Sequence, residues 1–394
     1  MRILYYIPGP TYGGAHNQVV RLSAPLRAAG YDPVALLPDE PGDGFERLQA
    51  AGIETYRAPL YRLRATTNAA THWRLATSFG PQIGRVARFL ADQRIDLVQV
   101  HGVTNVDGAL AARRAGLPLV WQILDTRAPR ALRAMTAPLI QRYADAVLVT
   151  GTTVGALYPG LSALGDRLVP YYPPVSGVEF APPSPEARAA ARARLGVADD
   201  EVLVGDLGNL NRQKGHQYVV EAVGRVRRTL PGVTLRIRGG AAPGHEQYER
   251  DVEQLAASFG LPADTVGRLP QGMDSAAFLG ALDLFAVGSE PRSEGVPTAI
   301  IEAMLTGVPV VASDVGGIAE AVRTGETGFC VPPRDPAAMA QRLEQLAGDA
   351  GLRTAMGELS RRIALAELSL ESCVDAHLRA YSAALDHGRA RVAR

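Results

Sequence analysis

Residues 284–312 read LFAVGSEPRSEGVPTAIIEAMLTGVPVVA. The four apolar residues at 284–287 predict a buried strand, which is followed by a polar loop that contains glycine. A helix is expected to begin at about Pro297, because proline suits the first helical position, and to be closed by Gly307. The apolar residues 308–312 then predict a second strand. A strand, a helix and a strand in this order predict a βαβ unit with parallel strands.

The same alternation continues over most of the chain and predicts two parallel sheets covered by helices on both faces. A proline-rich segment at 170–183 has little periodicity and predicts a linker between them. We therefore expect an α/β fold made of two doubly wound, Rossmann-like domains that face each other across a cleft. The further strands are expected at residues 3–7, 33–37, 97–100, 119–123, 146–149, 202–206 and 234–237.

The length of 394 residues agrees with two domains, because a single hydrophobic core rarely grows so large. We predict an N-terminal domain at 1–173 and a C-terminal domain at 174–367. A last apolar stripe with helical spacing predicts a helix at about 368–394 that packs back on the N-terminal domain.

Composition excludes several classes of protein. Hydrophobic residues make up 47%, charged residues 21%, and the net charge is +1, which is typical of a globular protein without a nucleic-acid partner. The two cysteines, Cys330 and Cys373, provide neither a metal-binding spacing nor a disulfide framework. The sequence offers no signal peptide and no membrane span, so a cytoplasmic location is expected.

The stretch 56–90 is rich in arginine and aromatic residues. One interpretation is peripheral contact with an anionic membrane surface at its inner face. The other is an acceptor-side region whose arginines are solvated. The residues concerned are Arg57, Arg62, Arg64, Arg74, Arg85 and Arg88, with Tyr61, Trp73 and Phe89.

Lys214 is the only lysine among 41 basic residues. Codon bias can account for the arginines but does not account for the exception. A compact ammonium kept at one position favours a chemical role for that residue.

Lys214 lies in the loop 207–215, directly after an expected strand, together with Gly208, Asn209 and Arg212. Glycine lets the backbone approach a ligand closely, and Lys214, with Arg212 as a candidate helper, could neutralise a diphosphate. The alternative for this loop alone is a turn with solvated cations.

The loop after the strand at 284–287 leads to a helix N-terminus, which favours anions. Two carboxylates, Glu294 and Glu302, lie beside it and would repel a phosphate, but they could accept hydrogen bonds from hydroxyl groups. A cation, a helix N-terminus and paired acceptors together suit a sugar–diphosphate–ribose ligand. The alternative is that Glu294 complements the helix dipole and Glu302 is a surface residue.

The run 293–304, continued at 307–312 and by Gly316-Gly317, resembles the signature of family 4 retaining glycosyltransferases with the GT-B fold. Glu294 and Glu302 match that family's motif of two glutamates separated by seven residues, and Lys214-Gly215 matches its Lys-Gly element. Gly13-Gly14-Ala15 is similar to the family's N-terminal glycine loop. The segment 96–101 is similar to the element that carries its active-site histidine, here His101.

The resemblance implies a hexosyltransferase that moves a sugar from a nucleotide-sugar donor to a hydroxyl acceptor with retained anomeric configuration. The N-terminal domain would then bind the acceptor and the C-terminal domain the donor. Same-face attack without a metal ion or protein nucleophile is expected. The resemblance gives catalytic roles to His101 and Glu294, the latter through donor-sugar hydroxyls. It assigns donor binding to Gly13, Gly14, Gly208, Asn209, Arg212, Lys214, Gly295, Val296, Pro297, Thr298 and Glu302.

Three positions depart from the family pattern. Gly208-Asn209 stands where the family usually has Gly-Arg, Leu124-Asp125 where it often has His-Asp, and Tyr171-Tyr172 where an Asn-Gly pair is usual. An inactive GT-B homologue that acts as a partner or binding subunit therefore stays an alternative. A sugar-nucleotide epimerase, a phosphorylase and a two-lobed sugar-binding protein are further alternatives. The acceptor, the donor sugar, its base and the oligomeric state are left open.

Overall fold

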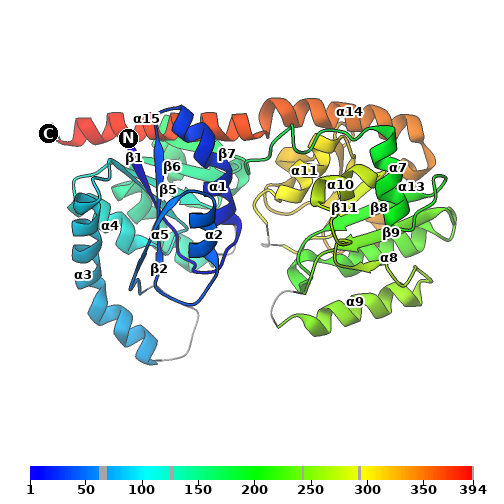
Figure 1. Ribbon diagram of the computed structural model, residues 1–394, viewed down its shortest axis with the longest axis horizontal. Coiled ribbons are helices and arrows are strands. Elements are labelled where there is room, and N and C mark those ends of the chain that lie inside the picture. Colours follow the sequence, from blue (N-terminus) through cyan, green and yellow to red (C-terminus); the bar gives the residue numbers. More distant parts are fainter. Residues whose placement is uncertain (62–68, 125–127, 242–243, 292–293, 393–394) are drawn as a thin grey trace. The chain divides into compact units, whose positions relative to one another are not determined.

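The computed structural model of the chain describes residues 1–61, 69–124, 128–241, 244–291 and 294–392 (Figure 1). It describes the backbone but not the side chains at 69–72, 74–76 and 392. Arg62, Arg64, Asp125 and Ser293, all named from the sequence, lie outside the described residues. The chain forms two compact units, one of residues 1–174 and 370–394 and the other of residues 175–369.

The first unit contains a parallel sheet in the order β3-β2-β1-β4-β5-β6-β7. Pro170 and Tyr171, which the proline-rich pattern places in the linker, belong to β7. Proline is tolerated there because β7 is an edge strand, where the backbone N–H that proline lacks need not pair with a further strand. The strands are β1 (Arg2–Tyr6), β2 (Asp32–Pro38), β3 (Glu54–Ala58), β4 (Leu97–His101), β5 (Leu119–Ile123), β6 (Ala146–Thr150) and β7 (Leu168–Tyr171).

Helices cover both faces of this sheet, as its alternating buried side chains require. One face packs against α1 (Gly14–Ala28), α2 (Gly44–Ala50) and α15 (Leu370–Val392). The other face packs against α3 (Ala69–Asp92), α4 (Val106–Arg114) and α5 (Arg130–Tyr143). A short helix, α6 (Thr152–Ala156), and a 3₁₀ segment, η1 (Leu161–Arg167), connect β6 to β7.

The C-terminal helix α15 is joined to the sheet by a buried polar network. The hydroxyl of Tyr381 lies 2.8 Å from the hydroxyl of Tyr5 and donates to Gln99 Oε1 at 2.8 Å. Gln99 Nε2 donates to Gln122 Oε1 at 2.7 Å, so the network crosses from β1 through β4 to β5. Because each of these groups is buried, losing one partner would leave another unsatisfied. The network therefore fixes where α15 lies along the sheet.

The far end of α15 is held by a buried carboxylate. Asp145, ahead of β6, accepts from His387 Nδ1 at 2.9 Å and from Arg391 Nη1 at 3.1 Å. Arg113 at the end of α4 donates to the other oxygen of Asp145 at 2.8 Å. The paired arginines compensate the buried charge.

The second unit contains a parallel sheet in the order β10-β9-β8-β11-β12-β13. The α/β class with two doubly wound sheets, predicted from the sequence, is confirmed. The strands are β8 (Val202–Leu207), β9 (Val233–Arg238), β10 (Val266–Gly267), β11 (Leu284–Val287), β12 (Val310–Ser313) and β13 (Gly328–Val331).

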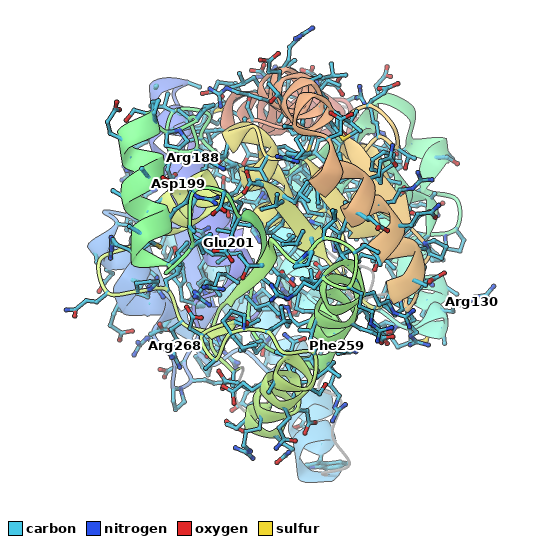
Figure 2. The ribbon with its side chains drawn as sticks, turned by 90° about the vertical axis from the view of Figure 1, so that its right-hand side faces the viewer. Arg130, Arg188, Asp199, Glu201, Phe259 and Arg268 are labelled. Atoms are coloured by element: carbon cyan, nitrogen blue, oxygen red, sulfur yellow. The ribbon has the colours of Figure 1, made fainter. Side chains whose placement is uncertain are left out.

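One face of this sheet packs against α8 (His216–Val226), α9 (Glu246–Ser258) and α13 (Pro336–Gly348). The helices α10 (Ser275–Ala281) and α11 (Thr298–Thr306) contact β8, β11 and β12. Next to them lie α7 (Pro185–Arg194) and α14 (Ala350–Glu367), while α12 (Ile318–Ala321) precedes β13. Arg188 of α7, labelled in Figure 2, donates to Asp283 at 2.8 Å and so ties α7 to the start of β11.

The strand order of each sheet reverses once. The reversal falls between β1 and β4 in the first unit and between β8 and β11 in the second. Open α/β sheets bind ligands beyond the carboxyl ends of their strands at such a reversal. The loops after β1, β4, β8 and β11 are therefore the places to look for a site.

The buried histidines predict that stability falls as the pH is lowered. Burial lowers the pKa of His377 to about 4, and burial together with His377 and His16 lowers that of His101 to about 3. In the unfolded chain a histidine titrates near pH 6.5. Below that value only the unfolded state gains these protons, so stability present above pH 6.5 is lost progressively toward pH 4. Thermal melts between pH 7.5 and 4.5 should show this decline.

The variant His377→Gln should lower the melting temperature at pH 7 but flatten its decline with pH. The matched control is His245→Gln, at a half-buried position ahead of α9, which should keep the wild-type slope. An unchanged slope in His377→Gln would contradict this account.

Candidate functional site

The loop after β8 is shaped by two local signals. The side chain of Asn211 accepts a hydrogen bond from the amide of Gln213 at 3.0 Å and caps a single 3₁₀ turn, η2 (Arg212–Lys214). Gly215 then adopts φ +63°, a left-handed conformation that favours glycine, and α8 begins at the next residue. This turn places Lys214 at the carboxyl end of β8.

The loops after β8 and β11 touch backbone to backbone. A Cβ atom built on Gly215 would lie 1.9 Å from the carbonyl oxygen of Gly288, far inside any permitted contact. The amide of Glu290 also donates to the carbonyl of Gln213 at 2.9 Å. Only glycine permits so close an approach, and it brings the two loops into register.

Lys214 and Glu294 form an ion pair between these loops. Lys214 Nζ donates to Glu294 Oε1 at 2.7 Å, and the buried hydroxyl of Ser289 donates to the same oxygen at 3.1 Å. An ammonium has three N–H donors, and this contact uses one of them. The pair thus holds a cation in place with donors left for a further acceptor.

A third loop fixes the backbone of Glu294. Gly316, after β12, adopts φ +60°, and a Cβ atom there would lie 2.0 Å from the carbonyl oxygen of Glu294. The amide of Gly317 donates to the carbonyl of Gly295 at 2.9 Å. The Gly-Gly pair therefore supports the segment that carries the carboxylate.

Helix α11 begins beside this segment. Pro297 is its N-cap and Thr298 its first residue, one position later than the sequence indicated, and Gly307 ends it with φ +82°. Glu302 lies within the helix and is only 8% exposed, so it is not the surface residue of the alternative interpretation. Its burial among apolar neighbours agrees with a carboxylate kept for a specific partner.

A second carboxylate of the β11 loop is already compensated. Glu290 accepts from Tyr218 at 2.7 Å and from Arg334 Nε at 2.5 Å. These three residues and Ser289 could not be named from the sequence, because only the fold brings α8, the β11 loop and the turn after β13 together. Lys214 therefore pairs with Glu294 while Arg334 compensates Glu290.

The other residues named in the β8 loop, Gly208, Asn209 and Arg212, have different surroundings. Gly208 lies next to the Lys214 side chain. The carbonyl of Asn209 accepts from His216 Nε2 at 3.4 Å, and Asp206 in turn holds the other ring nitrogen of His216 at 2.6 Å. Arg212 is 70% exposed in its side chain and pairs with Asp251 at 3.3 Å, so it is not gathered with Lys214 and Glu294.

In the first unit the named residues lie at the carboxyl ends of β1 and β4. Gly13 is the N-cap of α1 and Gly14 is its first residue. His101 ends β4, is fully buried and meets the Tyr5 ring edge-on at 5.6 Å. Among the described residues its Nδ1 atom has no hydrogen-bond partner. A buried polar atom of this kind calls for an explanation, such as a bound group or water.

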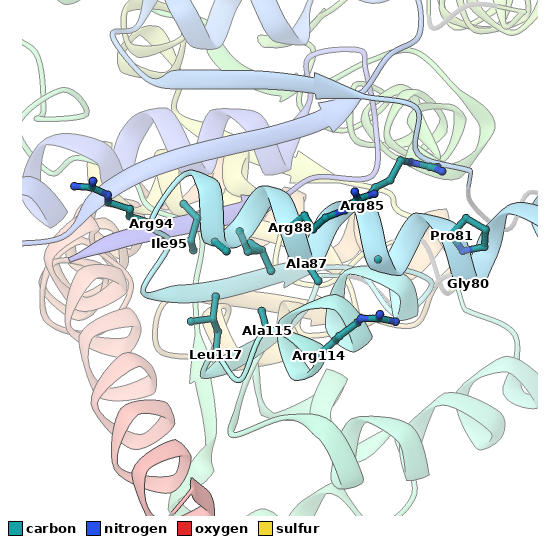
Figure 3. A pocket seen from close by; sticks show the side chains of 13 residues that line it. Gly80, Pro81, Arg85, Ala87, Arg88, Arg94, Ile95, Arg114, Ala115 and Leu117 are labelled. Carbon is teal, nitrogen blue, oxygen red and sulfur yellow. The ribbon is translucent and has the colours of Figure 1, made fainter.

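A described hollow of the first unit lies elsewhere. It has a volume of about 790 Å³ and runs between α3 and the end of α4 (Figure 3). Figure 3 shows Arg85 and Arg88 on α3, and Arg94 and Arg114 near its rim. The segments at 94–95 and 114–117 lead into the amino ends of β4 and β5, opposite the edge where His101 lies. We name this hollow the arginine-lined groove.

The described residues contain neither a metal-binding cluster nor a membrane-spanning helix. Within the described ranges, no group of three or more His, Cys, Asp or Glu side chains is arranged to hold a metal ion. No helix among the described residues has the length and apolar character needed to cross a membrane.

Comparison with known proteins identifies the class. Residues 13–172 match the family described as Glycosyl transferase 4-like domain, and residues 201–349 match Glycosyl transferases group 1. The D-inositol 3-phosphate glycosyltransferase of Streptomyces scabiei is 32% identical over 319 residues, which are 75% of this chain and 70% of the relative. A GDP-mannose-dependent monoacylated alpha-(1-6)-phosphatidylinositol monomannoside mannosyltransferase of Corynebacterium glutamicum is 32% identical over 50% of this chain and 52% of its own length.

Solved structures show the same fold over nearly the whole chain. Anabaena HepE in complex with UDP has a TM-score of 0.80 at 23% identity, covering 97% of this chain and 100% of that one. A glycosyltransferase from Rickettsia africae has a TM-score of 0.80 at 18% identity, covering 98% of each chain. The chain belongs to the group 1, family 4-like glycosyltransferases with the GT-B fold, as the sequence predicted. It is a nucleotide-sugar-dependent transferase of this family.

The contact between the two loops predicts a specific effect of Gly215→Ala. The substitution strains a left-handed residue and also forces a Cβ atom into the Gly288 carbonyl, so the Lys214 loop must move. We expect a clear fall in melting temperature and a loss of the Lys214–Glu294 contact.

Gly260→Ala is the matched control, because Gly260 also has a positive φ of +67° but nothing lies within 4 Å of its Cβ position. Its strain alone should cost about 1–2 kcal/mol. Equal losses in both variants, measured by thermal unfolding, would show that the loop contact does not matter.

Proposed function

We propose that the nucleotide-sugar donor binds at the carboxyl ends of β8 and β11, with its diphosphate against Lys214. The observation that carries this proposal is the Lys214–Glu294 pair at 2.7 Å, which lies where the strand order reverses. Lys214 is also the only lysine of the chain. Amides of residues 295–298, ahead of and at the start of α11, would add donors to the diphosphate.

The two carboxylates would recognise hydroxyl groups of the donor. Glu302, buried in α11, suits the paired hydroxyls of the ribose, and Glu294 suits hydroxyls of the transferred sugar. When a diphosphate binds to Lys214, the lysine ammonium would contact both the diphosphate and the Glu294 carboxylate. The ion pair would thus hold the Lys214 ammonium and the Glu294 carboxylate in position before the donor binds.

For Gly13, Gly14 and His101, at the carboxyl ends of β1 and β4 in the first unit, we propose contacts with a bound ligand. Within the described part of the chain the buried Nδ1 atom of His101 has no hydrogen-bond partner, which supports a polar partner supplied by a ligand. Because its pKa is lowered to about 3, the imidazole is neutral at ordinary pH and would act by hydrogen bonding.

Catalysis would then rest on stabilising the leaving diphosphate rather than on a protein nucleophile. Lys214 and the amides near α11 would offset the charge that develops on the diphosphate as its bond to the anomeric carbon breaks. Attack by the acceptor hydroxyl from the same face would retain the anomeric configuration, without a metal ion.

Similar proteins differ in the nucleotide that they bind or are named for. Structures of Anabaena HepE hold UDP and UDP-glucose, whereas the C. glutamicum relative is named for GDP-mannose. The relatives' acceptors are inositol 3-phosphate and a phosphatidylinositol mannoside, and both offer hydroxyl groups. We propose a hydroxyl acceptor for this chain as well.

The donor site is tested by binding nucleoside diphosphates of uridine, guanosine, adenosine and thymidine, measured by calorimetry and thermal shift. One base should stabilise the protein by roughly 2.7 kcal/mol at about a hundred times its dissociation constant. Lys214→Met and Glu302→Gln should each lose about 1.5–3 kcal/mol of binding, or roughly ten- to a hundred-fold in affinity.

Two control variants remove the same kinds of charge from exposed positions of the same unit. Arg225→Met removes a cation of α8 that pairs with Glu221, and Glu326→Gln removes a carboxylate after α12. Both should keep wild-type affinity. Unchanged affinity in Lys214→Met and Glu302→Gln would refute the assignment, and donor binding without any turnover would favour the inactive alternative.

The same-face mechanism predicts the stereochemistry of the product. The new glycosidic bond should carry the anomeric configuration of the donor, which the one-bond carbon–proton coupling at the anomeric centre reports by NMR. An inverted product would exclude this mechanism while leaving the donor site intact.

A further inference from the structure

A second, smaller hollow of about 240 Å³ lies in the first unit, between α3, α5 and the loop after β4. We name it the apolar hollow. The side chains that define it belong to Phe79, Val103, Val106, Leu132, Met135 and Leu139.

The position of the apolar hollow is that of a ligand site. Val103 and Val106 follow β4, whose carboxyl end borders the reversal of strand order between β1 and β4. Tyr61, after β3, contributes from the same edge of the sheet. The arginine-lined groove lies at the opposite edge. Of the two hollows, only the apolar hollow meets the rule for ligand sites in open α/β sheets.

The lining of the apolar hollow is poorly explained by folding alone. Met135 is 71% exposed, and Leu132, Leu139 and Phe79 are half-buried. None of these four belongs to the hydrophobic core that α3, α4 and α5 form with the sheet. Apolar side chains that gather around a hollow instead of entering the core mark a binding surface.

Among the described residues that line the hollow, the ionisable side chains are Asp107 and the Tyr61 phenol. The Asp107 carboxylate accepts from Gln82 Nε2 at 2.5 Å and from the hydroxyl of Tyr6, so it faces protein donors. Burial raises its pKa. Among the described residues that line the hollow there is no cation to compensate a phosphate, and the buried Asp107 carboxylate would repel one.

We propose that the apolar hollow binds an uncharged hydrophobic part of the acceptor, which makes the acceptor an alkyl- or aryl-bearing hydroxyl compound. The role as acceptor rests on the proposed function; the binding of a hydrophobic group does not. The volume exceeds the about 150 Å³ that holds a benzene molecule, so one aromatic ring or a short alkyl chain fits. Each methylene buried there gains roughly fourfold in affinity.

The probe for the test is 4-(dimethylamino)benzonitrile, an uncharged dye with one aromatic ring whose emission changes in apolar surroundings. It should bind the full chain saturably without any nucleotide. Leu139→Trp, which fills the hollow from a half-buried position, should weaken binding by about tenfold or more. Met135→Asp, at an exposed position, should also weaken it by bringing a charge to the rim.

The matched control is Leu157→Trp. Leu157 ends α6 in the same unit, is 36% exposed and does not line the hollow, so probe affinity should be unchanged. Melting temperature and nucleoside diphosphate binding are measured on every variant, so a folding defect is recognised directly. Wild-type probe affinity in both Leu139→Trp and Met135→Asp would overturn the proposal.

Competition identifies the source of the hydrophobic group. Octyl β-glucoside below its micellar concentration should displace the probe if an alkyl chain fits, and phenyl β-glucoside if an aromatic ring fits. Methyl β-glucoside and glucose 6-phosphate share the sugar and should displace neither. Displacement by glucose 6-phosphate as strong as by octyl β-glucoside would overturn the proposal. If the wild-type chain binds the probe but none of the nucleoside diphosphates, the donor site is refuted while the binding of a hydrophobic group stands.

Discussion

A parallel sheet has two apolar faces, and both must be covered before the sheet is stable in water. In the first unit this need is met by helices from both ends of the sequence. Helices α1 and α2 cover part of one face, and α15 returns to cover β5, β6 and β7. The polar chain from Tyr5 through Tyr381 and Gln99 to Gln122 then fixes that helix at one place on the sheet.

The same constraint leaves only the strand ends free for chemistry. With faces covered, loops at the carboxyl edge carry the groups that can meet a ligand, and glycine decides how close those loops come. Gly215 against Gly288, and Gly316 against the carbonyl of Glu294, bring three loops within backbone contact. The Lys214–Glu294 pair is a result of this backbone packing more than of its own attraction, because a partly exposed ion pair contributes little to stability.

The sequence predicted features that depend on neighbouring residues, and it missed those that depend on distant ones. The βαβ unit at 284–312 was predictable because apolar runs and Gly307 act locally. Lys214 and Glu294 could be assigned to one site, since both follow strands. The direction in which the Arg212 side chain points could not be predicted, because it is set by an ion pair with Asp251, which lies 39 residues further along the sequence. Nor could the contact of Tyr5 with Tyr381, which are 376 residues apart.

Because Lys214 is the only lysine, the chain can be labelled chemically at a single side-chain amine. Apart from the α-amino group, Lys214 carries the only primary amine in the sequence. Reductive methylation with carbon-13 preserves the positive charge, so it would install a single side-chain reporter without neutralising the cation. The α-amino group is methylated as well, and the variant Lys214→Arg, which lacks the side-chain signal, tells the two resonances apart. In a protein of 41.8 kDa, one NMR signal could thus follow the environment of one ion pair.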